Sequence, residues 1–259
     1  MASKIKIGFI IALLITISSS LFAKGQHDFY QIKIYHLKNN EQVVLVDEYL
    51  KNVYLPALHR LNIKNIGVFK PIANDTASVK FIYVLIPFKS EEEWMKLDQS
   101  LLKDATYPSD AKSFCQAPAD KAPYERMESI LLEAFSSQGQ LLLPTTKNTE
   151  RIFELRSYES PTENLLAKKT AMFNRDEINI FKRLGFNPVF YGSVLSGAHM
   201  PNLMYMPIFN SVEERNAQWK VFGNDSKWKE ISSDPVNENK VSVSHIDSIL
   251  MHSTSYSDY

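Results

Sequence analysis

Three polar side chains in the second half of the chain have the spacing of one strand face. Glu154, Arg156 and Tyr158 are spaced two residues apart, with Phe153 and Leu155 on the other face, because successive side chains of a β-strand point to opposite faces. If the apolar face packs on helices, the charged face points toward the interior of the barrel that the strands are expected to form. A carboxylate and a guanidinium there need paired charges or hydrogen bonds. The set is therefore either a structural network or a polar pocket for a small anionic or planar ligand.

Neighbouring strands offer partners for these charges. In the fold expected below, the first and last strands of one unit are antiparallel neighbours, which predicts a pair between Arg156 and Asp247. Lys33 and Glu128 would form the corresponding pair earlier in the chain. Opposite charges across neighbouring strands stabilise a sheet by roughly 0.2–1 kcal/mol. We favour these structural pairs over a ligand site.

Three further residues are candidates for ligand contacts near a rim. His199 lies in a loop that leads into a strand, where a histidine can act as a general base or as a solvated cap. Tyr191 and Trp219 are the other two, although helix packing also explains the tryptophan. The six histidines show neither His-x-His nor His-x-x-x-His spacing, so the sequence predicts no metal site. No catalytic residue and no cofactor are assigned.

The elements that must position these residues come from an internal repeat. Three blocks recur in the same order about 120 residues apart. The matched pairs of blocks are 29–35 with 152–158, 87–93 with 208–214, and 128–131 with 247–250. Three matches in one order indicate that the chain holds one unit twice.

Each copy has the pattern β-α-β-β-α-β. Its second helix begins with a capping box, in which a serine and the glutamate three residues later satisfy free backbone donors; the two boxes are Ser90-x-x-Glu93 and Ser211-x-x-Glu214. Pro56 is expected to kink or interrupt the first long helix. The predicted division is a first, diverged repeat over 24–140, a linker over 141–150 and a second repeat over 151–259.

This pattern is that of the ferredoxin-like unit. One such unit leaves a face of its sheet uncovered, and two can bury those faces together. The predicted fold class is α+β, with two tandem ferredoxin-like repeats forming a pseudo-dimeric α+β barrel and the helices outside. The pseudo-dimer forms within one chain, and further association into a homo-oligomer is left open.

Composition and the N-terminus limit the function classes. Lys and Arg together number 29, as do Asp and Glu, so the chain lacks the basic surplus of a nucleic-acid binder. Residues 1–23 carry two lysines, an apolar run and a final alanine, the pattern of a secretory signal peptide. No second stretch reaches membrane length. We expect a soluble, periplasmic or secreted mature protein, with a retained N-terminal anchor as the alternative.

Several of these segments resemble the NIPSNAP family. The most specific are the Glu-x-Arg-x-Tyr strand over 151–158 and the Arg-Asn-Ala-x-Trp helix over 215–219. The resemblance covers the second half well, whereas the first half has Gln31-x-Lys33-x-Tyr35 in place of the acid and arginine. With its signal segment, the chain resembles exported bacterial members. The resemblance implies a dimeric α+β barrel and brings no settled reaction or cofactor.

Three function classes follow from these observations. We favour an exported protein that binds a small ligand or another protein without turnover. The alternative is an enzyme, either a cofactor-free oxygenase or isomerase such as other barrels of this type contain, or a haem-binding protein. His199 or His59 would then be the axial ligand of the haem. The hypothesis of a cofactor-free oxygenase or isomerase rests on fold analogy alone.

Overall fold

The computed structural model of the protein describes residues 27–144, 148–235 and 237–259. The predicted signal peptide over 1–23 lies outside the described residues. The first repeat contains the strands β1 (Phe29–Leu37), β2 (Gly67–Pro71), β3 (Lys80–Phe88) and β4 (Arg126–Ala134). Its helices are α1 (Asn40–Tyr49), α2 (Leu55–Arg60), α3 (Glu91–Met95), α4 (Leu97–Lys103), α5 (Tyr107–Asp110) and α6 (Lys112–Cys115), with single turns η1 (Leu50–Tyr54), η2 (Ala119–Lys121) and η3 (Ser136–Gln138).

The second repeat has the same order of elements. Its strands are β5 (Ile152–Glu159), β6 (Asn187–Ser196), β7 (Asn202–Phe209) and β8 (His245–Ser253). Its helices are α7 (Glu163–Met172), α8 (Ile178–Arg183), α9 (Val212–Asn224), α10 (Ser226–Ser232) and α11 (Asn239–Ser242), with one π-helical turn, η4 (Phe173–Glu177).

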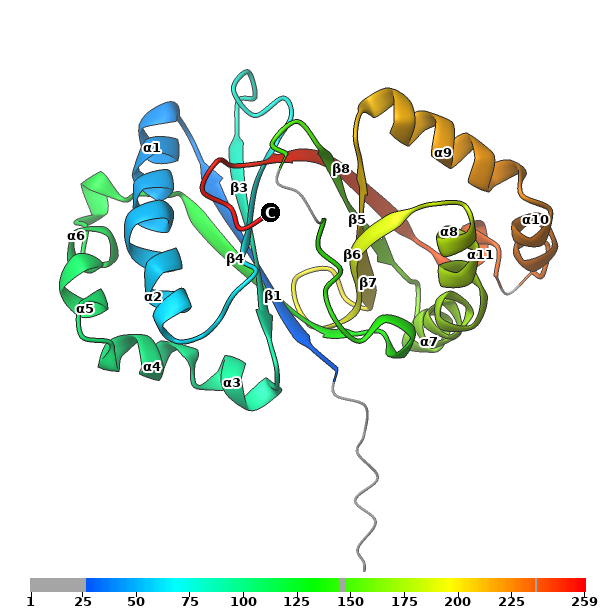
Figure 1. The fold of residues 1–259 in the computed structure, drawn as a ribbon, viewed down its shortest axis with the longest axis horizontal. Helices are drawn as coiled ribbons and strands as arrows, with labels where there is room; N and C mark the ends of the chain where they lie inside the picture. The colour runs from blue at the N-terminus through cyan, green and yellow to red at the C-terminus, as the bar shows by residue number, and fades with distance from the viewer. Residues whose placement is uncertain (1–26, 145–147, 236) are drawn as a thin grey trace, which may run out of the picture.

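The strands of both repeats close into one barrel, with the helices outside in two groups, one for each repeat (Figure 1). The order around the barrel is β1-β3-β2-β8-β5-β7-β6-β4. Each repeat supplies four adjacent strands, and the repeats join through the antiparallel pairs β2–β8 and β4–β6. The predicted pseudo-dimeric α+β barrel is confirmed.

Both predicted capping boxes begin helices. The Ser90 and Ser211 hydroxyls accept from the backbone N–H groups of Glu93 and Glu214, each at 3.2 Å. The two glutamates reach back and accept from the backbone N–H before each serine, at 2.6 and 2.9 Å. Two free donors are satisfied at each helix start, as the motif predicts.

The first long helix of each repeat contains a π-helical turn. The turn η1 ends just before Pro56, where an interruption was predicted, but η4 stands at the matching place in the second repeat with no proline. The repeat, rather than the proline, therefore sets this turn. Each helix stops at a residue with positive φ, Asn62 at 63° and Gly185 at 80°, a conformation that Gly and Asn adopt readily.

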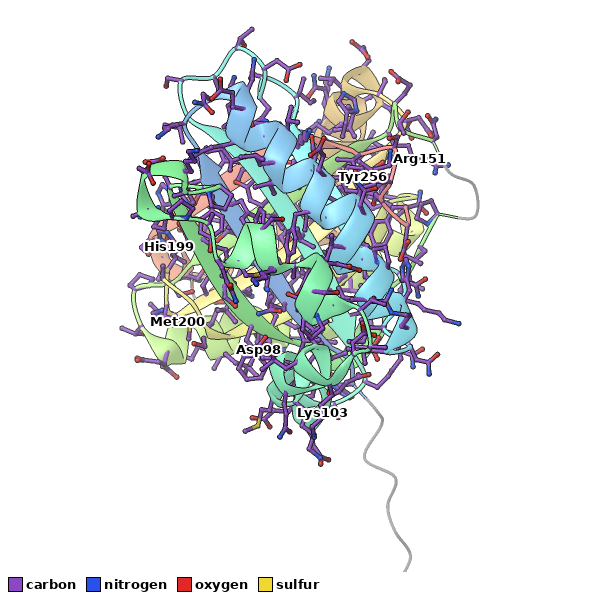
Figure 2. The ribbon with its side chains drawn as sticks, turned by 90° about the vertical axis from the view of Figure 1, so that its left-hand side faces the viewer. Asp98, Lys103, Arg151, His199, Met200 and Tyr256 are labelled. Atoms are coloured by element: carbon purple, nitrogen blue, oxygen red, sulfur yellow. The ribbon has the colours of Figure 1, made fainter. Side chains whose placement is uncertain are left out.

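The core has three parts. The barrel interior combines apolar residues of both repeats, and a separate apolar layer lies under the helices of each repeat. Leu141, Leu143 and the C-terminal Tyr259 belong to the interior cluster and close one end of the barrel. The tail that ends at Tyr259 crosses the first repeat, where the Tyr256 hydroxyl donates to Asp47 at 2.6 Å (Figure 2). Among the described residues, no helix is long and apolar enough to span a membrane.

Candidate functional site

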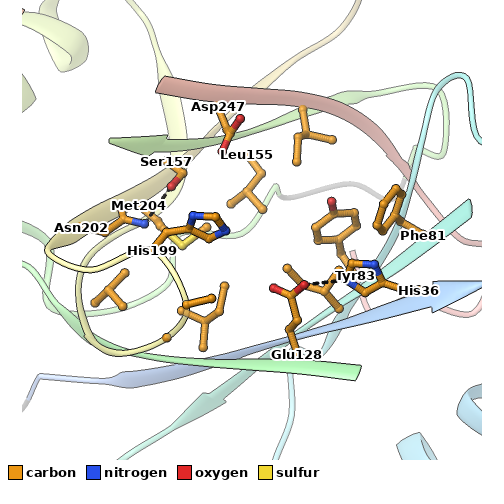
Figure 3. A pocket seen from close by; sticks show the side chains of 16 residues that line it. His36, Phe81, Tyr83, Glu128, Leu155, Ser157, His199, Asn202, Met204 and Asp247 are labelled. Atoms are coloured by element: carbon orange, nitrogen blue, oxygen red, sulfur yellow. Dashed lines mark hydrogen bonds and ion pairs between the residues drawn. The ribbon is translucent and has the colours of Figure 1, made fainter. Parts of the chain in front are cut away.

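The end of the barrel opposite Tyr259 holds a cavity of about 150 Å³ (Figure 3). Its walls come from strand ends of both repeats and from the loop between β6 and β7. Apolar side chains form most of the wall: Ile34, Phe81, Ile130, Leu155, Val194, Met204 and Ile249. The polar lining residues are His36, Tyr83, Glu128, Ser157, His199, Asn202 and Asp247.

Two polar groups at this cavity lack protein partners. Among the described residues, nothing accepts a hydrogen bond from the Tyr83 hydroxyl. Burial, together with the negative charges of Glu128 and Asp247, raises the pKa of Tyr83 well above its ordinary value, so the phenol stays protonated and can donate. Asn202 is 3 % exposed; its Nδ2 donates to the Ser157 hydroxyl at 2.8 Å, while its Oδ1 is buried without a partner in the described part of the chain.

A histidine–carboxylate pair lies on the side of the cavity formed by the first repeat. His36 Nε2 lies 2.6 Å from Glu128 Oε1, and Arg126 donates to the same oxygen at 2.8 Å. His36 is near the end of β1 and Glu128 near the start of β4, and these strands are antiparallel neighbours. Figure 3 shows His199, Tyr83 and Glu128 directed toward a common space. The cavity thus combines an apolar wall with a donor, an acceptor and a carboxylate.

Of the six residues predicted to contact a ligand, His199 lies at this cavity. It stands in the loop between β6 and β7, at the surface next to Met200 (Figure 2). Its Nδ1 is 3.0 Å from the Glu159 carboxylate. The rim position predicted for His199 is therefore where the structure places it. The remaining five candidates lie under the helices of the second repeat.

Glu154 and Arg156 face the helices, so the expectation that this charged face points into the barrel was wrong. The apolar residues Phe153 and Leu155 point into the barrel instead and join the interior cluster. Glu154 has no exposed surface. Both faces of β5 are covered, one by the opposite barrel wall and the other by helices, and the polar face is the one under α9.

The Glu154 carboxylate accepts hydrogen bonds from several elements. Arg215 of α9 donates to it through Nε at 2.9 Å and Nη2 at 2.6 Å, and the Trp219 indole donates at 2.7 Å. Arg156 Nη1 at 2.5 Å and the Ser248 hydroxyl at 2.6 Å complete the set. Burial alone would raise the pKa of Glu154, but these donors and the charge of Arg156 lower it to about 2.

Arg156 has the remaining partners of this network. It donates to the Tyr205 and Tyr158 hydroxyls, both at 3.0 Å, and its guanidinium lies 4.6 Å from the centre of the Trp219 ring. The predicted pair of Arg156 with Asp247 is wrong, because the register places Ser248 opposite Arg156. Asp247 is one residue away and so points to the barrel mouth.

The predicted pair in the first repeat is wrong for the same reason. Ser129 stands opposite Lys33 in the β1–β4 register, while Glu128 stands opposite Ile34 and faces the cavity. Lys33 donates to the Tyr54 hydroxyl instead, at 3.0 Å. The register, which the sequence did not specify to one residue, decides which face each charge occupies.

Tyr191 lies deep in the helix layer of the second repeat, with its hydroxyl buried and without a partner among the described residues. Burial and the charge of Glu177 raise its pKa well above the ordinary value. Glu177 is itself buried; desolvation raises its pKa to about 7, although Lys169 and Arg156 oppose the shift. Lys169 is also buried and donates to Asn239 at 2.8 Å. None of these three groups lines the barrel cavity, and they form part of the helix–sheet packing.

Comparison with known proteins agrees with this architecture. The sequence model of the NIPSNAP family matches residues 153–258, and none of the curated proteins matches the chain. The fold is similar to that of a "putative monooxygenase" from Fusobacterium nucleatum, with 7 % identity, a TM-score of 0.59 and 88 % and 93 % of the two chains covered. It is also similar to a "putative monooxygenase" from Lactobacillus acidophilus, with 11 % identity, a TM-score of 0.56 and coverages of 88 % and 94 %.

A third structure, an anthrone oxidase-like protein, has 9 % identity, a TM-score of 0.53 and coverages of 89 % and 92 %. At such identities these structures show the fold alone, which unrelated functions share. The family match covers the segment that carries Glu154, Arg156, Arg215 and Trp219. Residues 153–258, which make up most of the second repeat, are therefore a NIPSNAP domain.

Proposed function

We propose that the protein binds a small molecule of about one ring in the barrel mouth, without turnover. The observation that carries this proposal is an apolar cavity lined by the polar residues Tyr83 and Asn202, of which Asn202 Oδ1 is buried without a partner among the described residues. A buried polar group without a partner costs about 1–3 kcal/mol. A ligand that supplies the missing partner recovers this cost on binding.

The size of the cavity limits the ligand. An engineered apolar cavity of about 150 Å³ binds benzene, and the barrel mouth has the same volume. Tyr83 offers a donor and Asn202 an acceptor, and a phenolic hydroxyl both accepts and donates. A single ring with a hydroxyl group therefore fits the size and the chemistry of the site. A porphyrin contains four pyrrole rings and is too large for this cavity. Because His199 lines the same cavity, the size of the cavity argues against His199 as a haem ligand.

The test compares phenol with benzene, and a filled cavity with an open one. Titration of the protein should show tighter binding of phenol than of benzene, and Tyr83→Phe should remove that preference. Ile249→Phe places a larger side chain on the cavity wall and should weaken binding of both rings. Ile246→Phe is the matched control, because Ile246 is on the same strand but points to the opposite face and is 38 % exposed. Unchanged binding to the Ile249→Phe variant would overturn the proposal.

A second candidate, an enzyme without a cofactor, is supported by Glu128. Its carboxylate lines an apolar cavity next to His36, 2.6 Å away, and such a pair can remove a proton from a bound ring. Glu128→Gln separates the candidates, because the variant should still bind phenol but lose any turnover. The other haem candidate, His59, is bonded to Asp258 at 3.0 Å and does not line this cavity.

We further propose that residues 1–23 direct export, which would place this site in the periplasm or outside the cell. The support is the sequence of that segment alone, with its lysines, apolar run and Ala23. A site open to the surroundings at one end of a barrel suits capture of a small molecule there. Its test is described in the Discussion.

A further inference from the structure

We propose that the barrel mouth also carries a site for one divalent transition-metal ion. Three side chains would bind the ion, the carboxylates of Glu159 and Asp247 and the imidazole of His245, and His199 would hold Glu159 in place. The proposal is separate from ring binding, because none of these side chains belongs to the apolar wall of the cavity.

Strand pairing brings three of the groups together. Glu159 is the last residue of β5 and His245 the first of β8, and the two are partners in the antiparallel register. Asp247 is two residues further along β8 and therefore points to the same side. Ligand atoms of Glu159, His245 and Asp247 all lie within 4.8 Å of one another.

A second histidine, from a different part of the chain, lies next to this cluster. His199, in the loop between β6 and β7, places its Nδ1 3.0 Å from Glu159 Oε1. On the other side of the cluster, His245 Nε2 lies 3.0 Å from Asp247 Oδ1. Ligands at about 2.0–2.2 Å from one ion stand roughly 3.0–3.5 Å apart. The spacing between His245 and Asp247 falls in this range.

The donor set indicates the class of metal. Imidazole nitrogen suits zinc, iron, copper and nickel, whereas magnesium and calcium prefer oxygen alone. The ion-pair partners of Glu159 and Asp247 in the structure are histidines. A divalent cation at this place would lie between two carboxylates, which favour its charge.

A separate feature next to the cluster indicates a missing donor. Asn202 is the register partner of Glu159 on the other side of β5, and its buried Oδ1 has no partner among the described residues. A metal ion in such a site keeps water in the positions that the protein leaves open. A metal-bound water at the rim would be a donor for this oxygen.

The test is metal titration of the chelator-treated protein. Isothermal titration with Zn²⁺ should show one ion per chain, and Co²⁺ should give an absorption spectrum of nitrogen and oxygen coordination. His199→Ala and His245→Ala should each weaken Zn²⁺ binding by at least about tenfold. His252→Ala is the matched control, since His252 is on the same strand but bonds to the Arg151 carbonyl at 3.0 Å; its affinity should equal that of the unchanged protein.

Both substituted histidines have more than half of their side-chain surface exposed, so each variant should fold, and circular dichroism would verify this. Absence of saturable binding would overturn the proposal, as would equal affinity in His199→Ala, His245→Ala and the control. Metal titration uses no ring ligand and phenol titration uses no metal. Failure of one proposal is therefore distinguishable from failure of the other.

Discussion

Replacing Glu154 by glutamine removes one negative charge from beneath α9 with little change in shape. In the structure this carboxylate is fully buried and accepts from two arginines, a tryptophan and a serine. Glutamine keeps one acceptor oxygen and presents an NH₂ group to the remaining donors. Arg156 and Arg215 would lose their counter-charge in a buried place. Breaking a buried pair in this way costs about 3–5 kcal/mol.

The pKa of Glu154 gives a second, independent magnitude. Burial opposes ionisation, yet the donors lower the pKa from 4.5 to about 2, and each pKa unit corresponds to about 1.4 kcal/mol. The ionised form therefore adds about 3 kcal/mol of stability above pH 4.5. Because the folded-state pKa is the lower one, this stability is lost as the pH falls from 4.5 toward 2. The two magnitudes agree.

The assay is urea unfolding, followed by circular dichroism at several pH values. Glu154→Gln should lower the free energy of unfolding by about 3–5 kcal/mol at pH 7. The difference from the unchanged protein should shrink by about 2 kcal/mol at pH 3. Glu128→Gln is the control, since Glu128 is partly exposed at the mouth and should cost no more than about 1 kcal/mol.

Two results would refute this reasoning. A cost below about 1 kcal/mol for Glu154→Gln at pH 7 would mean that the network is not stabilised by its central charge. A difference between variant and unchanged protein that stays constant from pH 7 to pH 3 would mean that the carboxylate does not titrate as its donors require.

Four further predictions follow from the architecture. In a double-mutant cycle, Arg156→Met and Asp247→Asn should show a coupling energy below about 0.5 kcal/mol, because the two side chains lie on opposite faces of the sheet; coupling above that value would restore the pair. Glu177→Gln should stabilise the protein by up to about 3 kcal/mol at pH 8, because burial raises the pKa of Glu177 to about 7 and the unchanged protein loses stability as the pH rises from 4.5 through 7. Urea unfolding from pH 4 to 8 would detect this stabilisation. An unchanged dependence of stability on pH in the variant would contradict the prediction. Residues 24–140 expressed alone should dimerise or precipitate, since the barrel joins the repeats; light scattering that shows a folded monomer would be the contrary result. Mass spectrometry of the exported protein should find a start near Lys24, and an intact Met1 would refute cleavage.

The sequence carried enough to predict the barrel because its signals are local and occur twice. A capping box needs four residues and one helix start, and the boxes at Ser90 and Ser211 both form as predicted. The repeat then fixes the strand order, because two ferredoxin-like units can bury their sheet faces against each other. The two repeats then join through the β2–β8 and β4–β6 pairs.

The candidate site was predicted less well, for two physical reasons. Both faces of β5 are buried. The alternation of side chains along the strand shows that Glu154 and Arg156 share a face, but it does not show whether that face packs on the helices or lines the barrel interior. The partners that make burial tolerable, Arg215 and Trp219, come from α9, about sixty residues away in sequence. The expected pair with Asp247 also missed the register by one residue, which moves a side chain to the other face.

Apart from His199, the polar groups of the barrel mouth were not predicted from the sequence as one site, because they come from separate strand ends. Tyr83 is one aromatic residue in an apolar strand, and Asn202 is the first residue of β7. The rim histidines do not show the sequence spacing of a metal-binding motif, because His199 and His245 belong to different elements. The polar residues of the cavity and the rim histidines could be assigned to one site only after the strands had been placed around the barrel.

Comparison of the two repeats shows which role the family motif has in this chain. In the first repeat Gln31 replaces Glu154, and its amide donates to Ser129 at 2.8 Å where Glu154 accepts from Ser248. That repeat has the short helices α3 and α4 where the second has the long α9. The charged network and the unbroken helix therefore occur together, as expected if the network attaches α9 to the sheet. The motif charges are fully engaged in this attachment, so we infer that ligand binding is left to the barrel mouth, which both repeats build.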